Sequence, residues 1–436
     1  MKRILVTFLI SMLFYPISAF GEIQTITHTV KQPFAGSQSP DDARISAVAK
    51  AKREALEMAG TYIESLTVVK DSHVDKDEIL ALAAGVLKAE VVSQKNYASD
   101  DAFGIDVVVK VVVDTSVLEE RVKKLLQDKT HLTQLKDAQK REKELLQKVA
   151  QLEGENRRLT AKNQSSQELT REFQQTSRGL AAVDWVNQAL ALWDGEKYTD
   201  PKKAIVYLNN AIKLQHDYAD AYYTRGIAYG NVAQYQRAIE DYNEAIRLQP
   251  NDAVAYYNRG LMYANLGEYW RAIKDYDEAI RLQPDYANAF YNNRGTAHGN
   301  LGQYQRAIED FNKAIRLKPD DVFAYYNRGL AYDNLGQHHR AIEDYNKAIH
   351  LKPDYADAYN NRGMYYHSLG QYQRAIEDYN KAIHLKPDDG KAYNNRGVAY
   401  LRWKGKNNLG CRDVQKACAL GECTALEWAK GNGLCR

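Results

Sequence analysis

The stretch from Ala255 to Pro284, AYYNRGLMYANLGEYWRAIKDYDEAIRLQP, decides how the C-terminal half of this chain folds. Close copies of it fill residues 219–387, and one glycine marks each copy. The marker glycines are Gly226, Gly260, Gly295, Gly329 and Gly363, and Gly397 stands at the same place in the sequence that follows. They stand 34 residues apart, except for one step of 35 between Gly260 and Gly295. Such a period is typical of an array that stacks one small structural unit on the next.

Each copy carries two patterns of helix length, separated by a Leu-Gly turn. In the quoted copy, Gly260 and Tyr263 share one face of the first pattern, and Ala272 and Tyr276 share one face of the second. Small residues allow two helices to approach closely, and aromatic rings fill the space that remains. Pro284 ends the second pattern because proline has no backbone N–H to donate. Each copy therefore predicts a helix, a turn and a second helix.

The order of an aromatic residue, Gly, Tyr, Ala, an aromatic residue, Ala and Pro closely resembles the tetratricopeptide repeat over residues 219–387. We expect divergent copies at 185–214 and 391–420, the latter with its second helix rewritten around cysteines. The predicted fold class is mainly α. It comprises an α-solenoid of about seven helix–turn–helix repeats, over residues 179–420, preceded by a small α+β domain and a coiled-coil helix.

Composition limits the class of partner. The chain has 436 residues, 26% of them charged, and a formal net charge of +3. This length allows more than one domain. The basic residues alternate with Asp and Glu and do not form a stripe, so the electrostatic pattern of a protein that binds a phosphate backbone is missing. We expect no nucleic-acid partner.

Residues 1–21, MKRILVTFLISMLFYPISAFG, have the features of a secretory signal peptide. Two basic residues precede a short apolar run, and small residues follow a proline. We expect cleavage after Gly21 or Ala19. The apolar run is short for a membrane span, and the alternative is an uncleaved N-terminal anchor. The sequence therefore predicts an exported protein, periplasmic or secreted, with no membrane span after removal of the signal.

Residues 22–115 predict a separate α+β domain in the order strand, helix, helix, strand, strand. Ser39 can cap the first helix, and the carboxylates of Asp41 and Asp42 suit its N-terminal dipole. The helix sequence ARISAVAKAKREALEMAGTYIES is similar to that of the FlgT-type N-terminal domain of flagellar and other bacterial envelope proteins. The alternative is that alanine at this spacing only serves close helix packing.

Residues 116–178 predict a charged helix and a linker, with an imperfect heptad seam along the helix. The seam consists of Leu135, Ala138, Glu142, Leu145, Val149, Leu152, Asn156, Leu159 and Asn163. An Asn at an a position favours parallel self-association, so we expect a homo-oligomer through this coiled coil. The alternatives are a solvated helix or a spacer that packs on its own domain. The order of signal, coiled coil and repeats resembles that of CpoB-type periplasmic coordinators, which lack the extra N-terminal domain.

The resemblance to the tetratricopeptide family implies a concave groove lined by residues near the marker glycines. The implied partner-binding residues are Tyr223, Tyr257, Tyr326, Asn258, Asn265, Asn293, Asn300, Asn327, Asn334, Asn361 and Asn395. Asparagine offers a donor and an acceptor, and tyrosine offers a flat apolar surface. We therefore predict an extended polypeptide ligand, held with weak salt dependence because the groove is neutral. The alternative is that these asparagines are structural or only hydrated.

An Arg beside the marker glycine and an Asp in the second helix occur together in the copies from the second to the sixth, and both are missing from the divergent first copy. We interpret them as partly buried structural ion pairs between the two helices, with ligand contact as the alternative. The pairs are Arg225–Asp241, Arg259–Asp275, Arg294–Asp310, Arg328–Asp344 and Arg362–Asp378.

The four cysteines all lie in the last part of the chain, which for an exported protein predicts disulfides. Cys411 and Cys418 lie about 10 Å apart along one predicted helix, beyond the reach of a disulfide. A helix that folds back over residues 421–436 would bring Cys418 to Cys423 and Cys411 to Cys435. We predict this nested pairing, which would staple a capping helix over the last repeat. A zinc site is the alternative.

Motifs for catalysis are missing: there is no phosphate-binding loop, nucleophile elbow, HExxH motif or dinucleotide fingerprint. We therefore expect no enzyme, no catalytic residue, no cofactor and no metal site. The sequence predicts an exported, non-enzymatic scaffold that binds an extended polypeptide in the groove of its repeats. The alternative is a structural component of a flagellar or cell-envelope assembly that docks through its N-terminal domain.

Overall fold

The computed structural model describes most of the chain after residue 22. The segment interpreted as a signal peptide, residues 1–21, lies outside the described residues. The described residues are 23–34, 38–66, 69, 74–99, 102–160, 167–194, 197–284, 287–403 and 406–435. The chain divides into two compact units, residues 1–234 and 235–436. Among the described helices, none has the length and apolar character needed to cross a membrane.

The first unit contains a three-stranded antiparallel sheet with the order β1-β3-β2. Its strands are β1 (Ile23–Pro33), β2 (Lys88–Ser99) and β3 (Ala102–Asp114). In β3, Val107, Val109, Val111 and Val113 are fully buried, whereas Val108, Lys110 and Val112 between them are only partly covered. This alternation follows from the two-residue period of a strand, which turns every second side chain toward the same face. Alternate residues of the long valine run therefore face the core on one side of the sheet.

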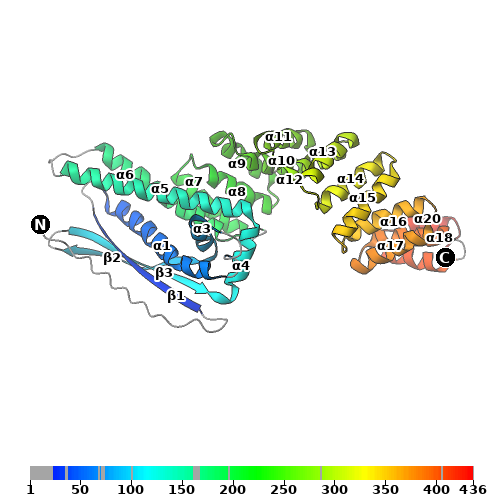
Figure 1. Ribbon diagram of the computed structural model, residues 1–436, viewed down its shortest axis with the longest axis horizontal. Coiled ribbons are helices and arrows are strands. Elements are labelled where there is room, and N and C mark those ends of the chain that lie inside the picture. Colours follow the sequence, from blue (N-terminus) through cyan, green and yellow to red (C-terminus); the bar gives the residue numbers. More distant parts are fainter. Residues whose placement is uncertain are drawn as a thin grey trace. The chain divides into compact units, whose positions relative to one another are not determined.

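Helix α1 (Pro40–Ser65) covers that face of the sheet (Figure 1). Helix α3 (Lys76–Val86) packs on α1, and the chain continues into α4 (Thr115–Gln127), α5 (Lys129–Thr160) and α6 (Gln167–Leu190). Ser39 caps α1 by accepting a hydrogen bond from the backbone N–H of Asp42. Alanines at helical spacing, including Ala47, Ala51 and Ala55, are fully buried and let α1 lie close to β3. The observed order of strands and helices is the order that the sequence predicts.

The apolar seam of α5 requires a correction. It is covered by helices of the same chain and does not form a stripe that a second copy could bind. Leu135 belongs to the main core of the first unit, Val149 packs on Leu180 of α6, and Leu152 is fully buried against Phe173. The expected self-association through a parallel coiled coil is therefore wrong, because α1, α3 and α6 already bury the residues that it requires. The residue Asn163 lies outside the described part of the chain.

The rest of the chain consists of paired helices. In the first unit these are α7 (Pro201–Leu214) and α8 (Ala219–Asn231). In the second unit they are α9 (Tyr235–Leu248), α10 (Ala253–Asn265), α11 (Tyr269–Leu282), α12 (Asn288–Asn300), α13 (Tyr304–Leu317), α14 (Val322–Asn334), α15 (His338–Leu351), α16 (Ala356–Ser368), α17 (Tyr372–Leu385), α18 (Gly390–Arg402), α19 (Asn407–Ala419) and α20 (Thr424–Gly431). Each helix of the second unit packs on the next. This arrangement confirms the predicted solenoid of helix–turn–helix repeats.

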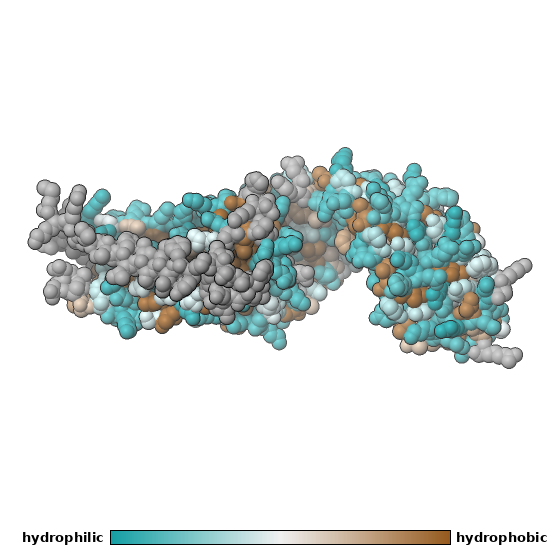
Figure 2. All heavy atoms as spheres, turned by 60° about the horizontal axis from the view of Figure 1, so that its bottom comes forward, coloured by the Kyte–Doolittle hydropathy of each residue, from teal (hydrophilic) through white to brown (hydrophobic). Residues whose placement is uncertain are grey.

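Close contact between an aromatic ring and a marker glycine holds together the repeats of Gly260, Gly295, Gly329 and Gly363, whereas Gly397 packs on Val414. A Cβ atom on Gly260 would lie 2.7 Å from Cε1 of Tyr276, and one on Gly329 would lie 2.8 Å from Cε1 of Tyr345. Both tyrosine side chains are almost fully buried. The glycine is therefore required because the ring of the second helix occupies the space of its side chain. On the face that Figure 2 shows, apolar residues form small separate patches among hydrophilic ones.

Candidate protein-binding face

The asparagines that stand two residues before the marker glycines reach across to the preceding repeat. Each donates a hydrogen bond from Nδ2 to the residue at the equivalent place, one position earlier, in that repeat. The contacts are Asn293 to Tyr257 Oη at 2.8 Å, Asn327 to Asn292 Oδ1 at 3.3 Å, Asn361 to Tyr326 Oη at 3.0 Å and Asn395 to Asn360 Oδ1 at 3.0 Å. We call these residues the asparagine ladder. It links α10, α12, α14, α16 and α18 in sequence.

The ladder changes which hydrogen-bonding atoms a ligand can use. We expected each asparagine to offer both a donor and an acceptor, but at least one amide hydrogen of Asn293, Asn327, Asn361 and Asn395 already serves the neighbouring repeat. Their Oδ1 atoms accept no hydrogen bond from the described residues. All four side chains are half-buried. The face that carries the ladder therefore keeps a free Oδ1 acceptor on each of these four asparagines, beside the amide hydrogens that remain on Asn327, Asn361 and Asn395.

The tyrosines of the predicted groove differ in their access to solvent. Tyr257 and Tyr326 are half-buried, and burial raises the pKa of both phenols, so their hydroxyls stay protonated. Tyr257 packs on Phe290 at 4.8 Å between ring centroids, and Tyr326 packs on Tyr355 at 4.9 Å. Tyr223, in the first unit, is only 6% exposed. Its expected role in contacting a ligand stays a prediction.

The remaining predicted asparagines lie at helix ends or beside the ladder. Asn265, Asn300 and Asn334 are exposed in the last turns of α10, α12 and α14. Asn334 donates a hydrogen bond to the carbonyl oxygen of Leu330 in its own helix at 2.8 Å. Asn258 is half-buried at the place where the ladder would continue. The part of these residues in binding a partner stays a prediction.

Apolar side chains that sequence reasoning missed lie on the same helices. Phe323 is 56% exposed and Met364 is 44% exposed. Phe323 stands three residues before Tyr326, and Met364 stands three residues after Asn361, so both share a helix face with the ladder. The ring of Phe323 meets that of Tyr355 edge-on at 6.1 Å. Their three-residue spacing from Tyr326 and Asn361 could have indicated both residues. They were missed because the residue at each of these two positions varies among the copies.

The arginines beside the marker glycines join three helices each. Arg328 donates from Nε and Nη2 to the two carboxylate oxygens of Asp344, at 2.8 and 2.6 Å, and from Nη1 to Asn312 in the preceding repeat. Burial alone would lower the pKa of Arg328, but the hydrogen bonds and the charge of Asp344 raise it above its ordinary value. We call this arrangement the arginine clamp. It ties a repeat internally and to its neighbour.

The clamp recurs along the second unit. The bidentate pairs are Arg259–Asp275, Arg294–Asp310, Arg328–Asp344, Arg362–Asp378 and Arg396–Asp413. Their Nη1 partners in the preceding repeats are Asn243, Asp277, Asn312, Asn346 and Asn380. The predicted pair Arg225–Asp241 has its members in different units and stays a prediction. Sequence reasoning missed Arg396–Asp413, whose spacing is one residue longer than in the other copies, and it missed every Nη1 partner.

The C-terminal segment forms a small apolar cluster closed by disulfides. Cys411 bonds to Cys435, with Cα atoms 5.4 Å apart, and Cys418 bonds to Cys423. Val414 of α19 and Ala425 and Ala429 of α20 pack together inside this segment. The described residues contain no group of His, Cys, Asp and Glu side chains that could hold a metal ion.

The first unit holds a buried carboxyl group on α5. Glu142 is 7% exposed, and the nearest charge is Nη1 of Arg53 on α1, at 3.8 Å from Oε2. Burial raises the pKa of Glu142 to about 7, although Arg53 acts in the opposite direction. Arg53 Nη1 also donates to the carbonyl oxygen of Gln139 at 3.1 Å. This network lies where α1 and α5 pack and is not part of the face that carries the ladder.

Comparison with known proteins agrees with the geometry of the second unit. A tetratricopeptide repeat model matches residues 253–286, 322–355 and 356–389, and a second TPR repeat model matches residues 234–267 and 295–336. Residues 234–286 and 295–389 therefore contain tetratricopeptide repeats. No curated protein matches the chain. The FlgT-type and CpoB-type resemblances stay predictions.

Several solved structures are similar to part of this chain. One is YrrB, a TPR protein with an unusual peptide-binding site; it is 26% identical, the match covers 42% of this chain and 95% of YrrB, and the TM-score is 0.36. A second is MamA (residue 41 to the end) from Desulfovibrio magneticus, 26% identical over 39% of this chain and 96% of MamA, with a TM-score of 0.37. A third is a tetratricopeptide repeat protein from Parabacteroides merdae, 20% identical over 56% of this chain and 95% of that protein, with a TM-score of 0.46.

Proposed function

We propose that this protein is a non-enzymatic scaffold that binds an extended polypeptide along the asparagine ladder of its second unit. Tetratricopeptide arrays use stacked helices to present a long binding surface to other proteins. The observation that supports this chain's own version is the row of free Oδ1 acceptors on Asn293, Asn327, Asn361 and Asn395, one in each repeat.

An extended polypeptide is the ligand that fits such a row. Its backbone N–H groups are donors at regular intervals, and an acceptor row can pair with them whatever the side chains are. Phe323 and Met364 add exposed apolar area beside the row, where side chains of the ligand can pack. The ladder itself carries no charged side chain, so we expect the complex to depend on hydrogen bonds and apolar contact more than on charge.

We also propose that the protein works outside the cytoplasm. Its N-terminal sequence has the pattern of a secretory signal. The two disulfides of the C-terminal segment support an oxidising compartment, because paired cysteines are kept reduced in most cytosols. We expect cells that express the full sequence to release the mature chain into the periplasm. All cysteines of the released chain should be unreactive to a thiol reagent.

Selection from a library of displayed peptides tests the binding proposal. Peptides that bind the full chain are measured against the Asn327→Ala, Asn361→Ala double variant, with Gln305→Ala on the exposed face of α13 as the matched control. We expect the double variant to bind about tenfold more weakly, as for the loss of roughly 1.4 kcal/mol. The control should bind as the parent chain does, and raising the salt concentration should change the affinity by less than about threefold.

Equal binding by the parent and the double variant would contradict the proposal and direct attention to the first unit, which is the docking part in the alternative of an envelope assembly. Separately, a steep loss of affinity with rising salt concentration would contradict the proposal that the binding face is neutral. Circular dichroism of the double variant should match the parent, because each ladder hydrogen bond adds only about 1 kcal/mol or less to stability.

A further inference from the structure

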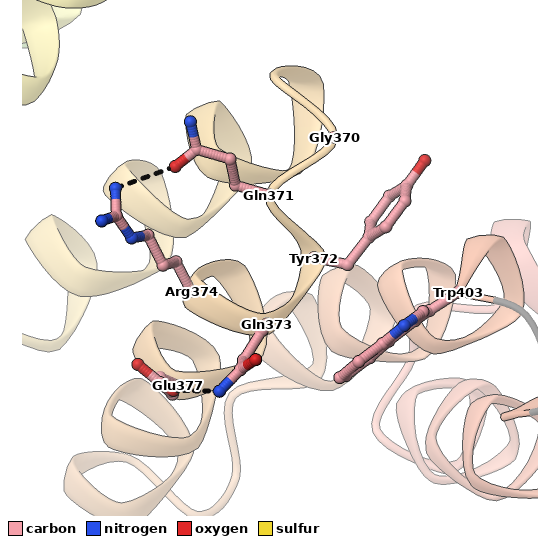
Figure 3. Close-up of a pocket in the computed structure, with 7 residues that line it drawn as sticks. All are labelled: Gly370, Gln371, Tyr372, Gln373, Arg374, Glu377 and Trp403. Carbon is pink, nitrogen blue, oxygen red and sulfur yellow. Dashed lines mark hydrogen bonds between the residues drawn. The ribbon is translucent and has the colours of Figure 1, made fainter.

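An open pocket lies at the start of α17 in the second unit (Figure 3). Most of its lining comes from the turn before α17 and the first turn of that helix. Trp403, which follows α18, completes the lining. The lining residues are Gly370, Gln371, Tyr372, Gln373, Arg374, Glu377 and Trp403. It contains none of the ladder residues and none of the arginine clamps.

Trp403 is what distinguishes this place from the other repeats. The turn sequence Gln-Tyr-Gln-Arg-Ala of this pocket recurs at residues 234–238 and 303–307. Six residues after the marker glycine, however, the earlier copies of the second unit have leucine, and only Gly397 is followed at that distance by tryptophan. The leucines are Leu266, Leu301, Leu335 and Leu369. The exchange places a large ring opposite a turn that is otherwise common to the array.

The pocket combines two aromatic rings with planar polar groups. In Figure 3, Tyr372 and Trp403 lie on one side, and the Gln371–Arg374 pair lies on the other. Arg374 Nη1 donates to Gln371 Oε1 at 3.0 Å, and Gln373 Nε2 donates to Glu377 Oε1 at 3.3 Å. Each of these single contacts leaves further donors and acceptors on the same side chains. The ammonium group of Lys406 lies 5.7 Å from the ring centroid of Trp403.

We propose that this pocket binds a neutral saccharide. A pyranose ring has an apolar face of C–H groups that can lie on an indole or phenol ring, and its hydroxyls both donate and accept hydrogen bonds. The pocket offers these complements together: amphipathic rings, two carboxamides, a guanidinium and a carboxylate. A strongly apolar ligand would leave the polar side chains unpaired. A multiply charged anion would meet Glu377, and a metal ion would find only one carboxylate.

The test uses the full chain labelled with 5-fluorotryptophan, which gives one ¹⁹F signal for each of its 5 tryptophans. Chitotetraose and cellotetraose are the saccharide probes, and tetraproline is the peptide probe. The signal that disappears in Trp403→Leu is assigned to Trp403. That variant has the residue that the other copies have at this position, so it should fold. We expect a saccharide probe to shift the Trp403 signal and to leave the signal of Trp270 unchanged.

Affinity measurements on variants locate the site. Isothermal titration of the saccharide that binds should show a loss of about tenfold or more in Trp403→Leu, equivalent to about 1.4 kcal/mol. Gln373→Ala, Glu377→Ala should weaken binding similarly without removing a ring. Trp270→Gln, which changes an exposed tryptophan to the residue found at the equivalent positions 236, 305 and 373, is the matched control and should bind normally.

Three outcomes would overturn the proposal. The Trp403 signal could stay unchanged at millimolar saccharide, the saccharides could bind equally to parent and Trp403→Leu, or tetraproline could shift the signal while the saccharides do not. The last result would assign the pocket to a proline-rich peptide. None of these results depends on the ladder, so the outcome is separate from that of the proposed polypeptide binding.

Discussion

The two units of this chain bury charged groups in different ways. In the first unit, Glu142 lies in a helix interface with Arg53 at 3.8 Å, and its pKa is raised to about 7. In the second unit, Asp344 is 4% exposed and receives two hydrogen bonds from one guanidinium; burial raises the pKa of Asp344 as well, and the hydrogen bonds and charge of Arg328 oppose that rise. The comparison teaches that burial alone does not decide the cost of a charge. A fork geometry that satisfies both oxygens makes the buried carboxylate part of the structure.

The sharpest way to break this comparison is to remove one member of a clamp. Asp344→Ala should lower the free energy of unfolding of the second unit by about 4 kcal/mol, because Arg328 is left half-buried without its partner. Urea unfolding followed by circular dichroism measures this. The matched control is the double variant Arg328→Met, Asp344→Leu, which should lose far less stability because no charge is buried. If Asp344→Ala lost less than about 1 kcal/mol, the clamp would be a surface contact without structural weight.

The seam of α5 gives the next largest effect. Leu152→Ala should destabilise the first unit by about 3 kcal/mol, since Leu152 is fully buried against α6. Light scattering on the parent and the variant should give the same mass, because the seam is covered within the chain. An oligomer in the parent that dissociates in Leu152→Ala would restore the coiled-coil interpretation and show that our correction is wrong.

The sequence was most informative where it repeats. Marker glycines, alanines and tyrosines recur at the same places, so helix pairs and their contact faces could be predicted from one copy. The partner of the α5 seam could not be predicted, because an apolar stripe indicates that a helix face is covered but does not identify the segment that covers it. Leu152 was assigned to a second chain for this reason, although Phe173 lies in the next helix.

The candidate site was predicted less well than the fold. The asparagines before the marker glycines were expected to face a ligand, but Asn361 and its equivalents also bond to the preceding repeat. A single copy cannot show such a contact, since its two members lie 35 residues apart for Asn361 and Tyr326. Arg396–Asp413 was missed for a related reason: the loop after α18 is one residue longer, which shifts the aspartate out of the common register.

A pH titration sharpens the comparison from the side of the first unit. Glu142 has a folded-state pKa of about 7 against an ordinary value of 4.5. The folded state therefore holds its proton more tightly than the unfolded state. The stability that this adds is complete below pH 4.5 and is lost as the pH rises to about 7, by roughly 2 to 3 kcal/mol.

The Glu142→Gln variant should remove this loss, so the first unit of the variant should be more stable than the parent at pH 8 and similar at pH 4. Thermal unfolding at both pH values measures the difference. Glu144→Gln, on the exposed side of the same helix, is the control and should keep the pH dependence of the parent. If Glu142→Gln also kept the pH dependence of the parent, a group other than Glu142 would cause that dependence.

The smallest expected effect separates the two arms of the clamp. Asn346→Ala removes the acceptor of Arg362 Nη1 in the preceding repeat, at 2.6 Å, and keeps the bidentate pair with Asp378. The contact is exposed, so we expect a loss of about 1 kcal/mol or less in urea unfolding. A loss as large as that of Asp344→Ala would mean that coupling between repeats outweighs the pair within the repeat.

The arrangement of the clamp bears on how such an array can grow. Each copy of the second unit brings an arginine that uses an acceptor on the copy before it, and most copies bring the asparagine that the arginine after it will use. A tandem duplication of 34 residues would thus supply a new module whose donors and acceptors are already matched at both junctions. For these contacts, a change in the number of modules needs no compensating substitution at either junction.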